Sequence, residues 1–584
     1  MDNDGQKLRD AITAHENLIA DLRVKLAPED RKMIDLRLAS IQLAEVKRVG
    51  SGAANTTESP EHLLAENRRS LPVQRYLGEA SDIRFFHAVE STFGQRPRPG
   101  QQDGPASQEQ VDSYEQEGIR PGSPEQNQGC LPHRTVADNL VDIYFSTIHI
   151  AYPFVSEPDF RATYENFWQS DSLEGFRGPW LSMLLTIFAL GSCYEKVAEA
   201  GDGTASNSHS SRQDVRYFDH AVAISQKHTS KRTVEHVCAL LTQSFYLLAT
   251  CQTDRCWITL GKAARIAQSI GLHVEEGSVS CGDAVSSHET RRRVWYSIFV
   301  LDRLLALQLG RPPSISDDGF NVKLPSRQSD DDLTEPGGHN NSHQQGWVGD
   351  YFIAMIKFSE ILGRVFHRLY GPKRSDDGVL TLSNIDLSDT ELLQWRSSLR
   401  RKLRFDLSHT FESSKVFQNQ RNMLAVKFYN LRALIHRPLL SLAKTTASSP
   451  NHLAWRQAEH RRISMSKRKC VMAAQQTAKL LHNLENKKSL VYGFPWWQMI
   501  SCLICASSIL LVASICVDLN SEIEVEVFED IDWLAVDEDA EVCLQVFQAL
   551  SSNSNAARLA RDMMQRLKKT RTISYGEFPC PLFR

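Results

Sequence analysis

Cysteine and histidine are the residues here that could hold a metal, and the chain has 12 cysteines and 19 histidines. Cys502 and Cys505 form the one Cys-x2-Cys pair. A structural zinc site needs four thiolate or imidazole ligands, and no second pair accompanies this one. His149 has no second donor at metal spacing either. The sequence therefore predicts reduced, packed thiols and no metal site in these residues.

Nucleotide-binding and hydrolytic motifs are absent from the sequence. It contains no phosphate-binding Gly-x-x-x-x-Gly-Lys-Ser/Thr, no dinucleotide glycine fingerprint, no Gly-x-Ser-x-Gly and no His-Glu-x-x-His. Asp302 and Arg303 are charged residues within an apolar run. Because an unpaired charge in such a run is costly, we expect a buried ion pair that ties neighbouring helices. We predict that the protein is not an enzyme.

Two helices must position Asp302 and Arg303, within the stretch 256–315. In the first helix, small and apolar residues recur every three or four positions on one face: Trp257, Leu260, Ala264, Ala267 and Gly271. Gly271 is expected to stop that helix, because glycine adopts the left-handed conformation without steric cost.

The second helix has a predicted start and end. Ser286 and Glu289 match a capping box. Gly310 and the pair Pro312-Pro313 end the helix. Its apolar stripe consists of Val294, Ile298, Leu301, Leu305 and Leu309.

This stretch resembles the signature of the fungal-specific transcription factor domain, which is the middle regulatory region of fungal zinc-cluster (Zn2Cys6) transcription factors. The matching residues are Trp257, Gly261, Ala264, Ala267, Gly271 and Leu272, followed by Arg292, Arg293, Trp295, Asp302, Arg303, Gly310, Arg311 and Pro312. Weaker similarity covers most of 131–518, and the phrases Tyr76-Leu77-Gly78 and 427–440 also resemble the family. The resemblance implies an all-α regulatory domain that controls a metabolic or biosynthetic gene set in the nucleus, with scope for a small-molecule effector.

The resemblance also raises the question of zinc. The family's DNA-reading module holds two metals with six cysteines, and the first cysteine here is Cys130. Zinc, and direct binding of DNA, are therefore expected only if an N-terminal module is missing, through a lost exon or a truncation. Otherwise the protein reaches DNA through a partner factor. The alternative function is a zinc-less protein that dimerises with a DNA-binding transcription factor and modulates it.

The N-terminal residues are predicted to form a short coiled-coil-like helix over 6–27. Leu8, Ile12, Ile19, Leu22 and Leu26 alternate at heptad spacing, interrupted by a histidine. In the family a coil usually follows the zinc module, so this seam could make a homodimer or heterodimer. A helix packed on its own domain is the other interpretation, because so short a match is weak evidence.

Charge is distributed unevenly, although the net charge is only −3. A loop-like basic cluster could serve nuclear import or be a solvated surface, and it consists of Arg461, Arg462, Lys467, Arg468 and Lys469. Residues 521–541 hold ten carboxylates among apolar side chains. They could form an activation segment, or an edge strand or loop before a final helix at 541–568.

The apolar run 499–517 is uncharged and long enough to cross a membrane, but its four serines and three cysteines argue for a buried core helix. The N-terminus shows no secretory signal. We expect no membrane partner, a nuclear location and an all-α fold in four parts. These are coil-like helices at 1–49, a mostly disordered linker at 50–130 with an apolar segment at 75–94, a helical regulatory domain at 131–518, and an acidic segment with a C-terminal helix at 519–584.

Overall fold

The computed structural model describes one compact unit, Gln74–Arg584, apart from the preceding unit Met1–Val73. The described residues are 76–93, 131–170, 176–199, 213–227, 232–275, 285–327, 347–372, 377–407, 414–440, 455, 458–482, 491–493, 495–519, 531–551 and 554–575. The predicted coil over 6–27 lies outside them. The all-α prediction is confirmed, because the described residues contain no strand beyond an isolated bridge between Val274 and Asn321.

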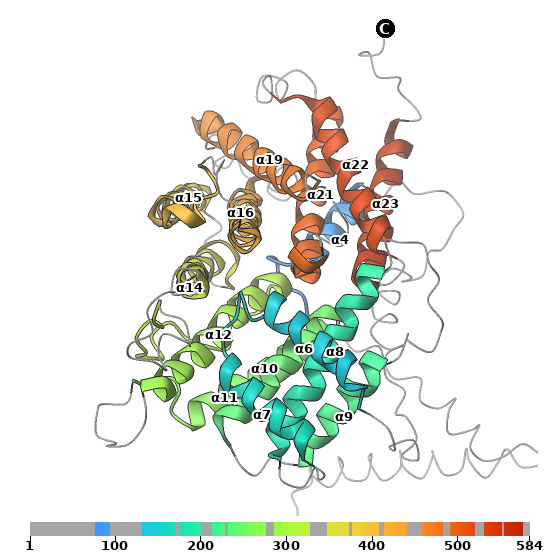
Figure 1. Cartoon of the computed structure of the whole chain (residues 1–584). Helices are drawn as coiled ribbons and strands as arrows, with labels where there is room; N and C mark the ends of the chain where they lie inside the picture. The colour runs from blue at the N-terminus through green and yellow to red at the C-terminus, as the bar shows by residue number, and fades with distance from the viewer. Residues whose placement is uncertain are drawn as a thin grey trace, which may run out of the picture. The chain divides into compact units, whose positions relative to one another are not determined.

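The first half of this unit contains seven described helices, α6 to α12, with α8 and α10 at the centre of their contacts (Figure 1). Helix α8 contacts α6, α9 and α10, and α10 also contacts α11 and α12. Their bounds are α6 Arg134–Thr147, α7 Glu157–Gln169, α8 Gly178–Glu199, α9 Gln213–Lys227, α10 Val234–Ala249, α11 Thr253–Ser269 and α12 Val285–Leu309.

The second half is organised around α19 and α21. Helix α19 contacts α16, α21 and α22, and α21 also contacts α23. Helix α14 contacts α12 and so links the two halves. The bounds are α14 Trp347–Val365 with a π-helical turn η4 Phe366–Tyr370, α15 Gly378–Ser398, the 3-10 turn η5 Arg401–Leu403, α16 Lys415–His436, α19 His460–His482, α21 Trp496–Leu519, α22 Trp533–Leu550 and α23 Asn555–Tyr575.

Helix α4, Asp82–Phe93, comes from the segment that the sequence placed within the linker, yet it packs against α21 and α23. Figure 1 shows this blue helix among the red C-terminal helices. Phe85, Phe86 and Val89 are buried there. The guanidinium of Arg566 on α23 lies 5.4 Å from the ring of Phe86. The apolar segment at 75–94 is therefore part of the helical core.

Two helices are long and apolar enough to cross a membrane, and both are core elements of this unit. Of the windows Gly178–Ala198 and Trp496–Ser514, 78% and 83% are buried inside the protein. The sequence analysis singled out only the second. Helix α21 is enclosed because it contacts α4, α16, α19, α22 and α23, which explains why its apolar residues occupy every side.

The acidic segment and the final helix differ from expectation. Residues from Trp533 onward form α22, whose N-cap is Asp532, and Val536 and Ala540 on this helix are buried. For this part the structure has a helix in place of the strand or loop alternative. Residues 521–530 of the acidic segment lie outside the described residues, and the activation segment stays a prediction. The single final helix expected at 541–568 is in fact two, since α22 ends at Leu550 and α23 starts at Asn555.

Candidate regulatory site

The first signature helix, α11, buries a face of small residues against α10. Leu260, Ala264 and Ala267 are 2% exposed or less, which lets the helices approach closely. The helix ends at Ser269, and Gly271 has a φ of +76°. The small face and the glycine stop follow the prediction. Trp257 is only half-buried, and its ring faces the guanidinium of Arg311, 5.2 Å away.

The start of α12 differs from the predicted capping box. The helix begins at Val285, so Ser286 lies inside it rather than at its N-cap. Glu289 is buried and accepts the backbone N–H of Ser326 at 2.8 Å. The Nε of Arg293 also donates to Glu289, at 2.9 Å. The capping interpretation is therefore wrong, because this carboxylate holds a loop instead.

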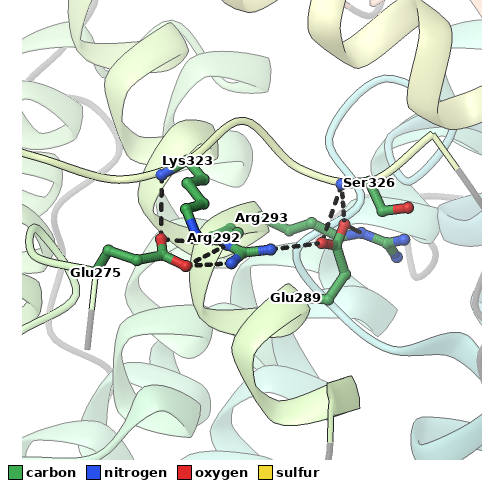
Figure 2. Close-up of polar contacts among 6 residues, drawn as sticks. All are labelled: Glu275, Glu289, Arg292, Arg293, Lys323 and Ser326. Atoms are coloured by element: carbon green, nitrogen blue, oxygen red, sulfur yellow. Dashed lines mark hydrogen bonds and ion pairs between the residues drawn. The ribbon is translucent and has the colours of Figure 1, made fainter. Parts of the chain in front are cut away.

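A second carboxylate completes this cluster, as Figure 2 shows. Glu275, just after α11, accepts a hydrogen bond from Arg292 Nε at 3.1 Å and the backbone N–H of Lys323 at 3.1 Å. The hydrogen bond from Arg292 holds the pKa of Glu275 below its usual value. Two carboxylates and two guanidiniums thus fasten the 321–326 loop to the signature helices. Because both acids are paired with arginine, the cluster is suited to holding structure and not to proton transfer.

Asp302 and Arg303 form the expected buried ion pair, with 3.3 Å between Oδ2 and NH1. The pair ties α12 mainly to the loop that follows it. Asp302 accepts the backbone N–H groups of Ser314 and Ile315, each at 3.0 Å. Arg303 donates to the Ile315 carbonyl at 2.8 Å. On the neighbouring helix α14, Arg303 lies against Gly363, where an added Cβ would be 2.9 Å from the Nε of Arg303.

Gly310 joins the end of α12 to a segment more than 200 residues earlier. It has a φ of +66°, and an added Cβ would lie 2.4 Å from the carbonyl carbon of Gly78. The backbone N–H of Gly78 donates to the Leu309 carbonyl at 3.0 Å. Arg311 donates to the Tyr76 carbonyl at 3.0 Å and pairs with Asp254 at 2.6 Å. Two phrases that separately resemble the family therefore meet here.

Arg437, at the end of α16, holds the same segment from the other side. It donates to Asp82 at 2.6 Å, to the Ala80 carbonyl at 2.7 Å and to the Glu79 carbonyl at 3.2 Å. Its side chain is 2% exposed. Burial raises the pKa of Asp82, and the nearby charge of Arg437 opposes that rise. No sequence pattern indicated that Arg437 is buried and holds this segment.

We refer to residues 76–82 as the docking segment, and two adjoining cavities lie beside it. The first holds about 60 Å³ between α4, α10, α12, α14, α16 and α21. The second holds about 80 Å³ and lies toward α23. Their shared wall consists of Asp82, Leu248, Gln308, Trp497 and Ser501. Sequence patterns could not reveal these cavities, because their walls come from distant helices.

The remaining predicted residues do not join this site. The basic cluster lies on α19 and is helical, not loop-like. Arg461 is exposed, Lys467 is buried, and Lys469 pairs with Asp389 at 3.0 Å. Arg462 pairs with Asp386 at 2.6 Å.

The candidate metal ligands also lie elsewhere. Cys502 and Cys505 are buried thiols on α21, and burial raises the pKa of Cys502 to about 12. His149 is buried, which lowers its pKa to about 3. Within the part of the chain that the structure describes, no group of three or more His, Cys, Asp or Glu residues could hold a metal ion.

The helical fold and its arginine-fastened signature can be compared with known proteins. Residues 141–405 match the fungal specific transcription factor domain. No solved structure matches the chain.

Curated relatives are fungal transcription factors. Transcription factor FBD3 of Fusarium pseudograminearum is 28% identical over 391 residues, which cover 63% of this chain and 49% of the relative. An ABC-transporter-regulating transcription factor of Aspergillus oryzae is 29% identical over 53% of this chain and 33% of its own length. Sorbicillinoid biosynthetic cluster transcription factor 2 of Penicillium rubens is 25% identical over 66% of this chain and 55% of its own length. The chain thus matches a third to just over a half of each of these relatives, which are named as regulators and not as enzymes.

Proposed function

We propose that this protein is a nuclear transcription regulator that controls a metabolic or biosynthetic gene set. The observation that carries the proposal is the match of residues 141–405 to the fungal specific transcription factor domain. The names of its relatives support the kind of gene set, since one regulates ABC transporters and another belongs to a biosynthetic cluster.

The docking segment gives this proposal a physical route. It connects α4 to the residues before position 76, and it is held by Gly310, Arg311 and Arg437. Ala80 and Asp82 also line the first cavity. An effector in that cavity would touch the docking segment directly, and could thereby change how the N-terminal residues are presented to DNA or to a partner.

Chromatin immunoprecipitation of the epitope-tagged full chain tests the function. We expect enrichment at a limited set of promoters, and changed transcript levels for the adjacent genes when the gene for this protein is deleted. Absence of enrichment together with an unchanged transcriptome would refute the proposal.

The second candidate function is the zinc-less partner protein, and it rests on the lack of six cysteines at zinc-cluster spacing in these residues. A gel-shift assay with the enriched promoter separates the two. Binding by the purified chain alone supports a direct regulator. Binding only with an added factor supports the partner protein.

Dimerisation through the predicted coil has its own test. Leu22→Pro would break the helix over 6–27, so sedimentation velocity should show a dimer becoming a monomer if this seam dimerises. Leu22→Ile is the matched control, since it keeps an apolar seam. An unchanged sedimentation coefficient in Leu22→Pro would assign the helix to intramolecular packing.

Nuclear import through α19 can be tested with a fluorescent fusion. Arg461→Ala and Arg468→Ala remove charge without disturbing Lys469 or its partner Asp389. We expect the double variant to shift toward the cytoplasm. Unchanged nuclear fluorescence would exclude this cluster as the import signal.

A further inference from the structure

Lys427 is a buried cation without an acidic partner. It lies on α16, is 9% exposed, and lines the first cavity. Its Nζ donates to the amide oxygen of Gln498 at 2.7 Å. Among the residues that the structure describes, no carboxylate forms an ion pair with it. Buried charges are ordinarily paired, because desolvating an isolated ammonium is costly.

Burial lowers the pKa of Lys427 to about 8, so the side chain stays mainly protonated at pH 7. The other charged group in this wall is Asp82, and Arg437 already balances that charge at 2.6 Å. The cavity therefore carries one uncompensated positive charge. An ammonium has three donors, and the one acceptor that the structure gives it is the amide of Gln498.

The rest of the wall is mostly apolar. It includes the side chains of Leu304, Leu305, Phe358, Leu362, Leu431 and Leu434. The amide oxygen of Asn430, in the same wall, is buried without a hydrogen-bond partner. A pocket with an apolar wall and a few convergent polar groups is typical of small-molecule sites.

We propose that this cavity binds a small organic carboxylate, whose anionic group pairs with Lys427 and whose apolar body packs between α12, α14 and α16. The inference deepens the proposed function, since it names the chemical class of the effector. An apolar cavity of about 150 Å³ accommodates benzene, whereas the first cavity holds about 60 Å³, so a ring also needs the adjoining cavity of about 80 Å³. The body can extend toward the adjoining cavity past Ser501, which lines both.

Binding to the purified full chain is tested by isothermal titration with three probes of one shape: benzoate, benzamide and benzylamine. We expect benzoate to bind at least about tenfold more tightly than benzamide, because a charge-assisted hydrogen bond is stronger than a neutral one. Benzylamine should bind most weakly. Equal affinity for benzoate and benzamide would overturn the proposal.

Two variants locate the binding event. Lys427→Met should weaken the affinity for benzoate by about tenfold or more and leave the affinity for benzamide within about threefold of its original value, because only the charge pair is lost. Ser501→Phe should reduce the affinity for both benzoate and benzamide, since the phenylalanine ring would fill the space shared by the two cavities. Lys357→Met is the matched control on the exposed side of α14 and should change neither. Benzoate binding that survives both Lys427→Met and Ser501→Phe would place the ligand elsewhere and refute the site.

The binding assay is independent of transcription, so the two proposals can fail separately. If benzoate binding is absent while promoters are still enriched, the ligand inference fails and the proposed function stands. If benzoate binds as expected but promoters and transcripts are unaffected, the site stands and the proposed function fails.

Discussion

Replacing Gly310 with alanine should detach the docking segment, and two other signature glycines provide matched controls. At Gly310 the new Cβ would meet a left-handed backbone with φ of +66° and the carbonyl carbon of Gly78 at 2.4 Å. At Gly271 φ is +76°, but the nearest atom is 3.9 Å away. At Gly261 nothing lies within 4 Å. Alanine therefore meets backbone strain and a collision at Gly310, backbone strain alone at Gly271, and neither at Gly261.

The expected changes in unfolding free energy differ in sign and size. Gly261→Ala should stabilise the protein by about 0.5–1 kcal/mol, because alanine favours a helix. Gly271→Ala should cost about 1–2 kcal/mol, the strain of a left-handed alanine. Gly310→Ala carries the same strain and must also push Gly78 away by about 1 Å to reach ordinary contact. Losing the hydrogen bond from Gly78 to Leu309 adds about 1–3 kcal/mol, for a total of about 2–5 kcal/mol.

Urea denaturation measures these differences, and hydrogen exchange locates them. Faster exchange across 76–93 is expected in Gly310→Ala and in the reciprocal Gly78→Ala, whose Cβ would lie 1.8 Å from the Gly310 carbonyl oxygen. Gly271→Ala should leave that region protected. If Gly310→Ala costs no more than Gly271→Ala and exchange at 76–93 is unchanged, the close approach is not what holds the segment.

Three further predictions concern buried charges. Arg437→Met should lower the unfolding free energy by about 3–5 kcal/mol, because it leaves Asp82 buried and unpaired. In urea denaturation, adding Asp82→Asn to the same chain should recover part of that loss. The pKa of Lys427 is about 8 in the folded protein, against 10.5 ordinarily, so between these pH values the unfolded chain holds one proton more than the folded chain. The unfolding free energy should therefore rise by about 3 kcal/mol as the pH increases through this range. This rise should vanish in Lys427→Met, and an identical pH profile in the two proteins would contradict the buried charge. Burial tends to raise the pKa of Asp389, but hydrogen bonds and charge from His436 and Arg432 outweigh burial and hold that pKa below 3.8. The contribution of Asp389 to the unfolding free energy is therefore present above pH 3.8 and is lost as the pH falls below that value. Asp389→Asn should remove this acid-sensitive contribution, as followed by circular dichroism.

Much of the helical layout followed from apolar periodicity. The predicted ends at Gly271 and Gly310 correspond to α11, which ends at Ser269, and α12, which ends at Leu309, and the apolar run 499–517 lies within α21 Trp496–Leu519. Helix α15, by contrast, begins at Gly378. Its start depends on Asp377, whose side chain accepts the N–H of Val379. A single capping residue is a weaker signal of a helix in the sequence than a long apolar stripe is.

The candidate site could be predicted only in part. The resemblance singled out Gly310, Arg311 and the phrase around Gly78, but no pattern in the sequence says that these residues touch. Asp82 and Arg437 lie 355 positions apart and form a buried pair. The burial of Lys427 depends on α14 and α21 packing against α16. Contacts of this kind depend on tertiary packing, which local periodicity does not encode.

The geometry at the end of α12 explains why glycine, arginine and proline stand together there. Gly310 is needed for a left-handed turn and for contact with another backbone. Arg311 is needed to reach three groups at once: the Tyr76 carbonyl, Asp254 and the ring of Trp257. Pro312 prevents the helix from continuing past them. Gly310 and Arg311 contact the docking segment, Arg311 also contacts α11, and none of these contacts involves a reacting group, so this part of the signature serves attachment. A ligand that moves α12 would therefore displace the contacts of Leu309 and Arg311 with residues 76–82.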